Sequence, residues 1–417
     1  MDRRAFLISS FGSFAALLPS SGWALPPPIK PKARVIVIGG GMGGATVTKY
    51  LRLWGDAVAV TLVERNARYV SSIMSSLVLT GQRTIADLTF GYDTLRNRYG
   101  VEVIIDDVAE VDSTRAAVKL TSGKQLTADR IVMAPGIDFE SIPGLDDTRM
   151  PHAWKAGVQT DLLAKQLAGM PENGVVLLTV PKAPYRCPPG PYERACLIAD
   201  WIKTKKPRAK LILLDANPDI TVEKEVFTRA FTGPYAKVIE YRNGVEISSA
   251  DAAQMTLSTN AGPVRGDVIN VIPPHRAGAL VATSGLLAGS DERFAPVDVL
   301  SYVSKTASNI HVIGDSCATT QPKAGHIANQ EAKVCADALV RIFAGGQPDP
   351  APVTNSACYS TISRTEATWL NAVFQFDPAT RSMVAVPKSF AASENWTAEN
   401  FKDMGKWFAA LMADTFS

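Results

Sequence analysis

The sequence predicts an α/β protein with two Rossmann-like dinucleotide-binding domains and a small α+β domain at its C-terminal end. Three observations predict this fold: a glycine-rich strand–turn–helix–strand unit from residue 33, a second strand–loop–helix–strand unit from residue 175, and strand-forming segments followed by an amphipathic helix after residue 346. Strands that alternate with helices are typical of parallel sheets covered by helices. With 417 residues, 46% of them hydrophobic, the chain can bury two or three domain cores.

The first unit carries the signature of a dinucleotide site. It consists of an apolar strand at 33–38, the turn Gly39-x-Gly41-x-x-Gly44, a helix at 43–53, and a strand at 58–63 that leads into Glu64. Glycines at this turn let the backbone approach a pyrophosphate at the helix N-terminus. Glu64 follows Gly44 at about the spacing from which a carboxylate reaches the adenosine ribose.

A second signal, far downstream, makes FAD the expected ligand rather than NAD. The strand at 310–313 ends in Gly314-Asp315, and a long helix is expected from Gly325 to Phe343. In flavoproteins with two dinucleotide-binding domains, the Asp bonds the ribityl chain and the helix points its N-terminus at the isoalloxazine. The segment "RIVMAPGI" adds the strand and glycine turn that close the first FAD segment. We therefore expect a split FAD-binding domain, 33–150 and 270–345, whose contacts include Gly39, Gly41, Met42, Gly43, Gly44, Glu64, Arg65, Ala134, Pro135, Gly136, Gly314, Asp315, Lys323 and Gly325.

The unit at 151–269 repeats the pattern without its glycines. A strand at 175–180, a helix from about Tyr192 to Lys203 and a strand ending at Asp215 are expected, but the intervening loop is rich in proline around Cys187. Proline fixes φ and removes the amide donors that hold phosphate. This nucleotide site is therefore degenerate, and NAD(P)H is not the expected source of electrons.

The C-terminal domain is expected at 346–417. The segments "TNSACYSTIS" and "LNAVFQFDPATRSMVAVP" predict three antiparallel strands, the last two joined by a turn at Asp377-Pro378. A terminal helix is expected from Thr397, a plausible N-cap, to Met412. Its apolar side chains recur at helical spacing, either to pack on its own sheet or to dock a partner or a membrane.

Several long motifs resemble those of one family. "MPHAWKAGVQT" (150–160), "APYRCPPGPYERA" (183–195), "DVINVIPPHRAG" (267–278), "HVIGD" (311–315) and "NSACYS" (355–360) are similar to signatures of the flavoprotein subunit of flavocytochrome c sulfide dehydrogenase. The resemblance covers essentially the whole chain after its leader, and it implies a fold of the disulfide-reductase and sulfide dehydrogenase type.

The resemblance implies a mechanism and a cofactor. Cys187 and Cys358 match the redox disulfide beside the flavin; sulfide attacks it, electrons pass through FAD to a c-type cytochrome, and sulfur or polysulfide is the product. Glu193 is the candidate for proton handling and Arg194 for anion attraction, although both are also explained by an ordinary ion pair at a helix start. Some members attach FAD through a cysteine in the segment that here reads "RYVSSIMSSLVLTG", and no cysteine occurs in 69–80. Non-covalent FAD is therefore expected.

The remaining cysteines have no assigned chemistry. Cys196 and Cys335 are expected to be buried core thiols, and Cys317 is left open because it follows the predicted flavin contact.

A haem on this chain would require C-x-x-C-H, and no two of the five cysteines have that spacing. The haem is thus expected on another protein, either a cytochrome subunit or a soluble cytochrome c.

The N-terminus predicts export to the periplasm. Arg3 and Arg4 precede a short apolar run and small residues up to Ala24, which is typical of a twin-arginine signal peptide over 1–24, with a short membrane anchor as the alternative. No transmembrane segment is expected in the mature chain.

The net charge of +3, with 43 basic and 40 acidic residues, gives no nucleic-acid footprint. The four scattered histidines predict no metal site.

Two other functions stay open. A sulfide:quinone reductase shares the fold and the disulfide logic but needs a quinone channel and membrane contact. A non-catalytic flavoprotein partner could serve other sulfur-oxidising proteins by thiol exchange. A thiol or a persulfide is an alternative sulfur donor, since the sequence does not reveal the dimensions of the pocket.

Overall fold

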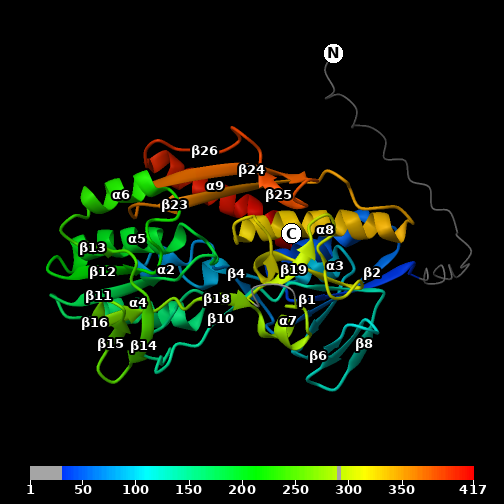
Figure 1. Cartoon of the computed structure of the whole chain (residues 1–417), viewed down its shortest axis with the longest axis horizontal. Coiled ribbons are helices and arrows are strands. Elements are labelled where there is room, and N and C mark those ends of the chain that lie inside the picture. The colour runs from blue at the N-terminus through cyan, green and yellow to red at the C-terminus, as the bar shows by residue number, and fades with distance from the viewer. Residues whose placement is uncertain (1–30, 289–292) are drawn as a thin grey trace, which may run out of the picture. The chain divides into compact units, whose positions relative to one another are not determined.

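The computed structural model describes residues 31–288 and 293–417 (Figure 1). The predicted signal peptide at 1–24 lies outside the described residues. The α/β fold expected from the sequence is confirmed, with two mainly parallel sheets and a separate antiparallel sheet near the C-terminus. The domain boundaries drawn from the sequence stay predictions.

The first sheet joins segments from both sides of the central unit. Its strand order is β22-β19-β20-β21-β9-β1-β2-β5, with the bounds β1 (Ala33–Ile38), β2 (Val58–Glu64), β5 (Glu102–Ile105), β9 (Arg130–Met133), β19 (Ala295–Asp298), β20 (Val303–Ser304), β21 (Ile310–Val312) and β22 (Cys317–Ala318). β21 pairs in parallel with β9, so that Ile310 lies opposite Ile131. This pairing brings the strand before Gly314 beside the glycine-rich turn after β1.

Smaller elements surround this sheet. They are the helices α2 (Ser76–Leu79), α3 (Asp93–Asn97) and α7 (Ala279–Thr283), the 3₁₀ turns Ala86–Leu88 and Gly314–Ser316, the strand pairs β3 (Tyr69–Val70) with β4 (Thr89–Phe90) and β10 (Ile137–Phe139) with β18 (His275–Ala277), and the sheet β6 (Val108–Asp112), β7 (Ala117–Leu120) and β8 (Gln125–Thr127).

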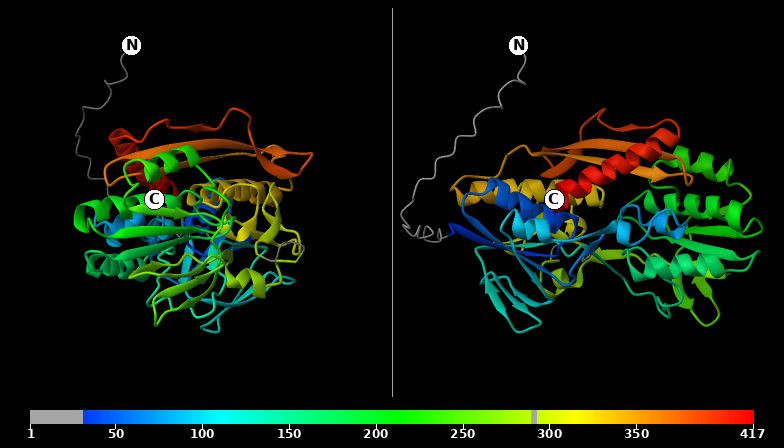
Figure 2. Two further views of the ribbon diagram at one scale, coloured as in Figure 1. Left: turned by 60° about the vertical axis from the view of Figure 1, so that its left-hand side comes forward. Right: turned by 180° about the vertical axis from the view of Figure 1, so that it is seen from behind.

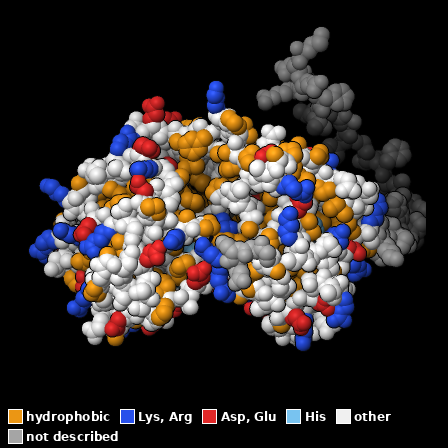
Figure 3. All heavy atoms as spheres, in the orientation of Figure 1, with side chains coloured by type: hydrophobic (Ala, Val, Ile, Leu, Met, Phe, Trp, Pro, Cys, Tyr) orange, Lys and Arg blue, Asp and Glu red, His pale blue; other side chains and the backbone are white. Residues whose placement is uncertain are grey.

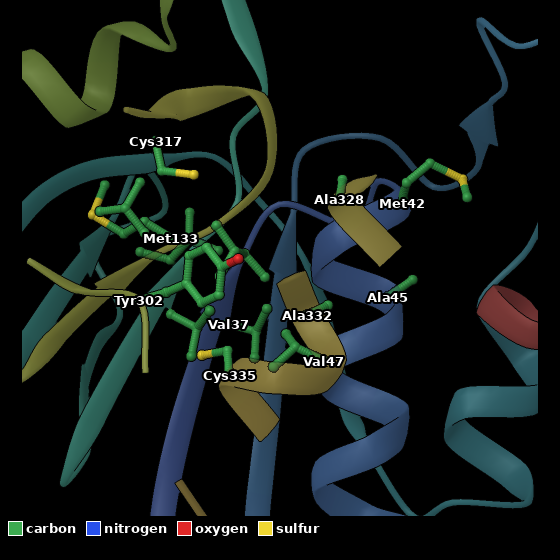
Figure 4. Packing of buried hydrophobic residues seen from close by; sticks show 14 of the residues in the cluster. Val37, Met42, Ala45, Val47, Met133, Tyr302, Cys317, Ala328, Ala332 and Cys335 are labelled. Carbon is green, nitrogen blue, oxygen red and sulfur yellow. The ribbon is translucent and has the colours of Figure 1, made fainter. Parts of the chain in front are cut away.

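Two long helices, α1 (Met42–Trp54) and α8 (Gly325–Phe343), pack against each other beside this sheet. Figure 4 shows the small side chains Ala45 of α1 and Ala328 and Ala332 of α8 in this region. Ala45 and Ala332 are completely buried. Small residues let the helix backbones approach closely, which fixes the positions of both helix N-termini at the sheet edge. α8 has the bounds predicted from the sequence, and α1 is one residue longer at each end.

The central unit is built on the parallel sheet β13-β12-β11-β17. Its elements are β11 (Val175–Val180), β12 (Lys210–Asp215), β13 (Ile239–Arg242), β17 (Val268–Asn270), α4 (Val158–Gly169), α5 (Gly190–Lys205), α6 (Lys224–Thr232), and the antiparallel strands β14 (Ile247–Asp251), β15 (Thr256–Thr259) and β16 (Gly262–Arg265). α5 begins two residues before the predicted Tyr192, because Pro191 is tolerated in a first turn whose N–H groups have no intrahelical acceptor.

The C-terminal domain confirms the predicted strands and their order. β23 (Val353–Thr361), β24 (Ala367–Asp377) and β25 (Ser382–Ala385) form an antiparallel sheet, to which β26 (Ala391–Ala392) adds a short fourth strand. The terminal helix α9 (Ala398–Phe416) begins after Thr397, whose hydroxyl accepts a hydrogen bond from the Asn400 N–H, and continues four residues beyond the predicted end. α9 lies along β24 (Figure 2) and also packs on α1. Its apolar face is thus covered by this chain's own sheet and helix.

On the face shown in Figure 3, basic and acidic side chains are interspersed, as the near-zero net charge predicts. Among residues 31–288 and 293–417, no helix is both long and apolar enough to cross a membrane.

The α1–α8 contact predicts a position-specific effect on stability. Ala332→Leu should lower the free energy of unfolding by about 1–3 kcal/mol, because the added carbons have no space between the two helices. Ala410→Leu, at an exposed position of α9, is the matched control and should leave stability nearly unchanged. Thermal melts of both variants measure the difference; equal melting temperatures would contradict the packing described here.

Candidate functional site

A large cavity opens where β1, β2, β9 and β21 end. It encloses about 1590 Å³, counting its open mouth, which exceeds the range of ordinary small-molecule pockets (about 300–1,000 Å³) and is large enough for an extended dinucleotide. Ligands of open α/β sheets bind at this edge. Most residues predicted to contact FAD line the cavity, namely Gly39, Gly41, Met42, Gly43, Glu64, Arg65, Ala134, Pro135, Gly136, Gly314, Asp315 and Gly325.

The glycine-rich turn needs its glycines for close backbone approach. Gly39 has φ +97°, and a Cβ there would lie 2.4 Å from the carbonyl oxygen of Ala134. Gly44 does not line the cavity; a Cβ at this position would lie 1.7 Å from the carbonyl oxygen of Gly39. Side chains are therefore excluded from both positions, and the turn can fold tightly onto the start of α1.

The acid at the end of β2 is held toward the turn. One carboxylate oxygen of Glu64 accepts a hydrogen bond from the Gly40 N–H at 2.7 Å, and the other accepts from the Asn66 N–H at 2.8 Å. The carboxylate keeps unused lone pairs, so it can also accept hydrogen bonds from ribose hydroxyls. Arg65, the next residue, forms an exposed ion pair with Asp107 at 3.1 Å.

The opposite wall holds a buried acid that lacks a partner. Asp315 is 9% exposed, and its Oδ1 has no hydrogen-bond partner in the described structure. Burial raises the pKa of this carboxyl, while Arg186 and Lys323 oppose the rise. A buried polar atom without a partner is costly, and a hydroxyl of a bound ribityl chain would satisfy it. The residues of this cavity therefore fit a flavin dinucleotide.

Lys323, like Gly44, is a predicted contact that does not line this cavity. Its ammonium group does not line this cavity but donates to the carbonyl oxygen of Cys317 at 2.7 Å and lies 3.7 Å from the ring centroid of Phe294. Instead, the backbone of Lys323 is important, because its carbonyl oxygen accepts the Cys187 N–H at 2.7 Å. This side chain points away from the cofactor cavity because its charge is compensated by an aromatic face and a carbonyl.

Cys187 and Cys358 line a second cavity, which adjoins the first and encloses about 810 Å³, counting its open mouth. Both are partly buried free thiols in this structure. Its other walls are mainly apolar and include Met74, Trp154, Met404 and Trp407. Two cysteines far apart in the sequence are thus brought to one site, while the disulfide bond between them stays a prediction.

The loop that carries Cys187 is fixed by backbone contacts. Cys187 has φ +58°, its N–H donates to Lys323, and its carbonyl oxygen accepts the Gly190 N–H at 2.9 Å. A Cβ at Gly190 would lie 2.8 Å from the Trp154 ring and 2.9 Å from the Cys187 Sγ. The glycine of "CPPGP" is therefore required for the thiol to lie against the start of α5.

Glu193 lies in the same cavity, one turn along α5. Its Oε1 accepts the hydroxyl of Thr361 at 2.7 Å, and burial raises its pKa to about 7. Burial also raises the pKa of both thiols, that of Cys358 to about 12. A carboxyl that titrates near neutrality beside two cysteines can accept or return a proton during thiol chemistry.

Arg194 lines the cavity of the two cysteines, but protein groups hold its guanidinium. It is 1% exposed and stacks on the Trp154 ring at 4.7 Å. Its guanidinium donates to Asn270 Oδ1 and to the backbone oxygens of His152 and Ala153. It forms no ion pair with Glu193 in the described structure. The explanation of this pair as an ordinary helix-start ion pair is therefore wrong, and these hydrogen bonds use most donors of the Arg194 guanidinium.

The other cysteines are buried away from this site. Cys196 and Cys335 are completely buried, which confirms the prediction of core thiols. Cys317, left open by the sequence, is also completely buried, and its thiol donates to the carbonyl oxygen of Gly314 at 3.1 Å. It lies behind the Gly314-Asp315 turn and does not line the cavity of Cys187 and Cys358.

Four residues join the two cavities, and sequence reasoning gave only Gly325 of these as a cofactor contact. Ser72, Ile73, Arg186 and Gly325 line both. Arg186 directly precedes Cys187, and this adjacency was the available signal. Its guanidinium donates to the carbonyl oxygen of Trp154 and to the Ser72 hydroxyl.

In the central unit, Asp215 occupies the position equivalent to Glu64, and its carboxylate is hydrogen-bonded within the chain. Asp215, at the end of β12, is completely buried, and its Oδ2 accepts the hydroxyls of Tyr192 at 2.7 Å and Tyr241 at 2.9 Å. Its Oδ1 accepts the backbone N–H and side-chain amide of Asn217, both at 2.8 Å. The carboxylate that would otherwise bind a ribose is thus already hydrogen-bonded to the chain's own groups.

Comparisons with known proteins agree with this geometry. Family models match residues 160–273 (the central part of the sulfide dehydrogenase [flavocytochrome c] flavoprotein chain), 350–416 (the flavin-binding part of flavocytochrome c sulphide dehydrogenase) and 33–170 (pyridine nucleotide-disulphide oxidoreductase). A sulfide dehydrogenase flavoprotein chain of Chlorobaculum thiosulfatiphilum is 47% identical over 45 residues, which are 94% of that sequence and 11% of this chain. The chain belongs to the flavocytochrome c sulfide dehydrogenase flavoprotein family.

Sulfide:quinone oxidoreductases are also similar to this flavoprotein. The mitochondrial enzyme of Mus musculus is 27% identical over 195 residues, 43% of this chain and 41% of that protein. The chain thus matches less than half the length of this curated relative. The solved structure from Aquifex aeolicus has a TM-score of 0.75 and 17% identity, covering 92% of this chain and 91% of that one. This likeness shows the shared fold, and the family match supports FAD as the cofactor.

The buried Glu193 of this flavoprotein predicts a pH effect on stability. The folded state holds its proton more tightly than the unfolded chain, so its contribution is full below about pH 4.5 and is lost as pH rises through about 7. Glu193→Gln should therefore reduce the fall in stability between pH 6 and pH 8, by about 1–2 kcal/mol.

Melting temperatures at both pH values measure this effect. Glu225→Gln, which changes an exposed acid of α6, is the control and should keep the wild-type difference. If Glu193→Gln loses as much stability over this range as the wild type, the raised pKa of Glu193 is wrong.

Proposed function

We propose that the chain is the FAD-dependent, sulfide-oxidising flavoprotein of a sulfide:cytochrome c oxidoreductase. The observation that carries the proposal is that Cys187 and Cys358, 171 positions apart, line one cavity that adjoins the cofactor cavity. A cysteine pair beside a flavin site, with an acid that titrates near neutrality, has the groups that disulfide exchange requires.

In the proposed reaction, hydrosulfide attacks one sulfur of a Cys187–Cys358 disulfide. The S–S bond breaks, the attacked cysteine becomes a persulfide, and the other leaves as a thiolate. A second hydrosulfide then attacks the outer persulfide sulfur and releases HS₂⁻. Reforming the disulfide completes the cycle, in which two hydrosulfide ions yield HS₂⁻, one proton and two electrons. Bound FAD would supply the two-electron acceptor, which can release electrons singly.

The chain's own groups have defined tasks in this scheme. The fixed backbone of Cys187 keeps its sulfur at the cavity wall after the disulfide opens. Glu193, oriented by Thr361, accepts the proton released when the disulfide reforms. The apolar walls around Trp154 and Trp407 exclude bulk water, which protects the persulfide from side reactions.

A c-type cytochrome is the proposed acceptor, since the cysteine spacing provides no haem attachment on this chain. Quinone is the second candidate, because both the mouse and the Aquifex relatives are sulfide:quinone oxidoreductases. A thiol-exchange partner without catalysis is the third. The periplasm is the proposed location, on the strength of Arg3, Arg4 and the apolar run that follows them.

Anaerobic addition of sodium sulfide to the FAD-loaded protein should bleach the flavin band near about 450 nm. Oxidised cytochrome c should restore the band and a quinone analogue should not, whereas restoration by the quinone alone would favour the reductase alternative. NADH should not bleach it, because Asp215 is occupied by its tyrosine and asparagine partners.

Cys358→Ser should bind FAD and lose sulfide-dependent bleaching by at least about 100-fold, since no disulfide can form. Cys335→Ala, at a buried thiol outside both cavities, is the matched control and should bleach at the wild-type rate. Unchanged bleaching in Cys358→Ser would remove this pair from the mechanism and favour a direct reaction or a thiol-exchange role.

We also propose that FAD is bound without a covalent link. Ser72 lines the cofactor cavity in the segment where some members have a cysteine, and a hydroxyl does not form the corresponding thioether. Acid precipitation should release all of the flavin into the supernatant, as measured by absorbance. Flavin that stays with the pellet and with a defined peptide in mass spectrometry would contradict this.

A further inference from the structure

The wall between the two cavities contains a cation that has no acidic partner. Arg186 lines both cavities, and its guanidinium donates to the Trp154 carbonyl and, at 3.4 Å, to the Ser72 hydroxyl. No carboxylate forms an ion pair with it within residues 31–288 and 293–417. A guanidinium carries a delocalised positive charge and five N–H donors but no acceptor.

The neighbouring cations are already neutralised or used. Lys155 forms an ion pair with Asp138 at 3.3 Å, and Arg194 is buried among carbonyl and amide oxygens. Lys323 turns its ammonium group to a carbonyl and an aromatic ring in another direction. Arg186 is thus the cation whose charge is available where the cavities meet, among the residues that the structure describes.

The charge of Arg186 acts on the cysteine that follows it. It lowers the pKa of the Cys187 thiol, against the larger effect of burial and the negative charges of Glu193 and Cys358. It lowers the pKa of Asp315 in the same way. The acids that act on Cys358 are Glu223 and Glu193, and Arg186 is not among its principal influences. The two cysteines therefore differ in their electrostatic surroundings.

We propose that Arg186, and not Arg194, is the residue that draws anions to the cysteine pair and stabilises Cys187 as a thiolate. This inference rests on the proposed function, in which both the attacking hydrosulfide and the leaving thiolate are anions. An otherwise apolar cavity disfavours a bare anion unless a positive charge compensates for the lost hydration. The cavity thus selects small sulfur anions, hydrosulfide and persulfides, over neutral thiols.

The test uses alkylation of the reduced protein, which requires no turnover. Cys187 is alkylated with iodoacetate, an anion, or with iodoacetamide, its neutral analogue, and the modified peptide is quantified by mass spectrometry. The rate with iodoacetate divided by the rate with iodoacetamide reports the local charge separately from the intrinsic reactivity of the thiol. In the wild-type holoprotein this ratio should exceed that of glutathione, a small thiol with no such cation beside it.

Arg186→Gln should lower this ratio at Cys187 about fivefold or more, whereas Arg186→Lys should keep it within about twofold, since it retains the charge. Lys182→Gln is the matched control, because Lys182 lies in the same loop but is exposed and paired with Glu246. It should leave the ratio unchanged. Flavin absorbance of each purified variant checks that the cofactor site is intact.

An equal ratio in Arg186→Gln and wild type would overturn the proposal. A wild-type ratio below that of glutathione would also overturn it, and this measurement requires no variant. A loss of the ratio in both Arg186→Gln and Arg186→Lys would assign Arg186 a purely structural role through Trp154 and Ser72. The failure of sulfide to bleach the flavin, with the alkylation ratios as expected, would instead count against the proposed function alone.

Discussion

The candidate site depends on one backbone contact, between the Cys187 N–H and the carbonyl oxygen of Lys323. It ties the proline-rich loop of the central unit to the segment that leads into α8, on which the cofactor cavity is also built. Together with this contact, the left-handed conformation of Cys187 and the close approach of Gly190 direct the sulfur into a cavity shared with Cys358.

Burial gives the site its chemistry. Glu193 and Glu331 both have a pKa raised to about 7 by desolvation, one beside the cysteines and the other under the Gly314 turn, whose N–H it accepts at 2.6 Å. In water these carboxyls would be ionised and of little use as proton carriers at neutral pH. The same desolvation disfavours thiolates, so a positive charge such as that of Arg186 becomes important.

The two Rossmann-like units show how one architecture keeps or loses a ligand. In the first, glycines leave the sheet edge open and Glu64 retains unused acceptor capacity. In the second, Tyr192 and Tyr241 donate to Asp215 and proline replaces the amide donors of the turn. The hydrogen-bonding capacity of the buried Asp215 is thus satisfied by the chain itself, and the proline-rich loop at this sheet edge holds Cys187.

The sequence by itself determined the fold class, the strand–helix order and most walls of the cofactor cavity, because glycine turns, apolar strands and the acids that follow them are local patterns. The resemblance of its motifs to sulfide dehydrogenase flavoproteins also implied that Cys187 and Cys358 belong together. Only the tertiary structure decided which charged groups face the site: Arg194 is used by neighbouring carbonyls, Lys323 turns away, and Arg186 remains at the junction. Side-chain direction and burial depend on partners distant in sequence, and no local pattern encodes them.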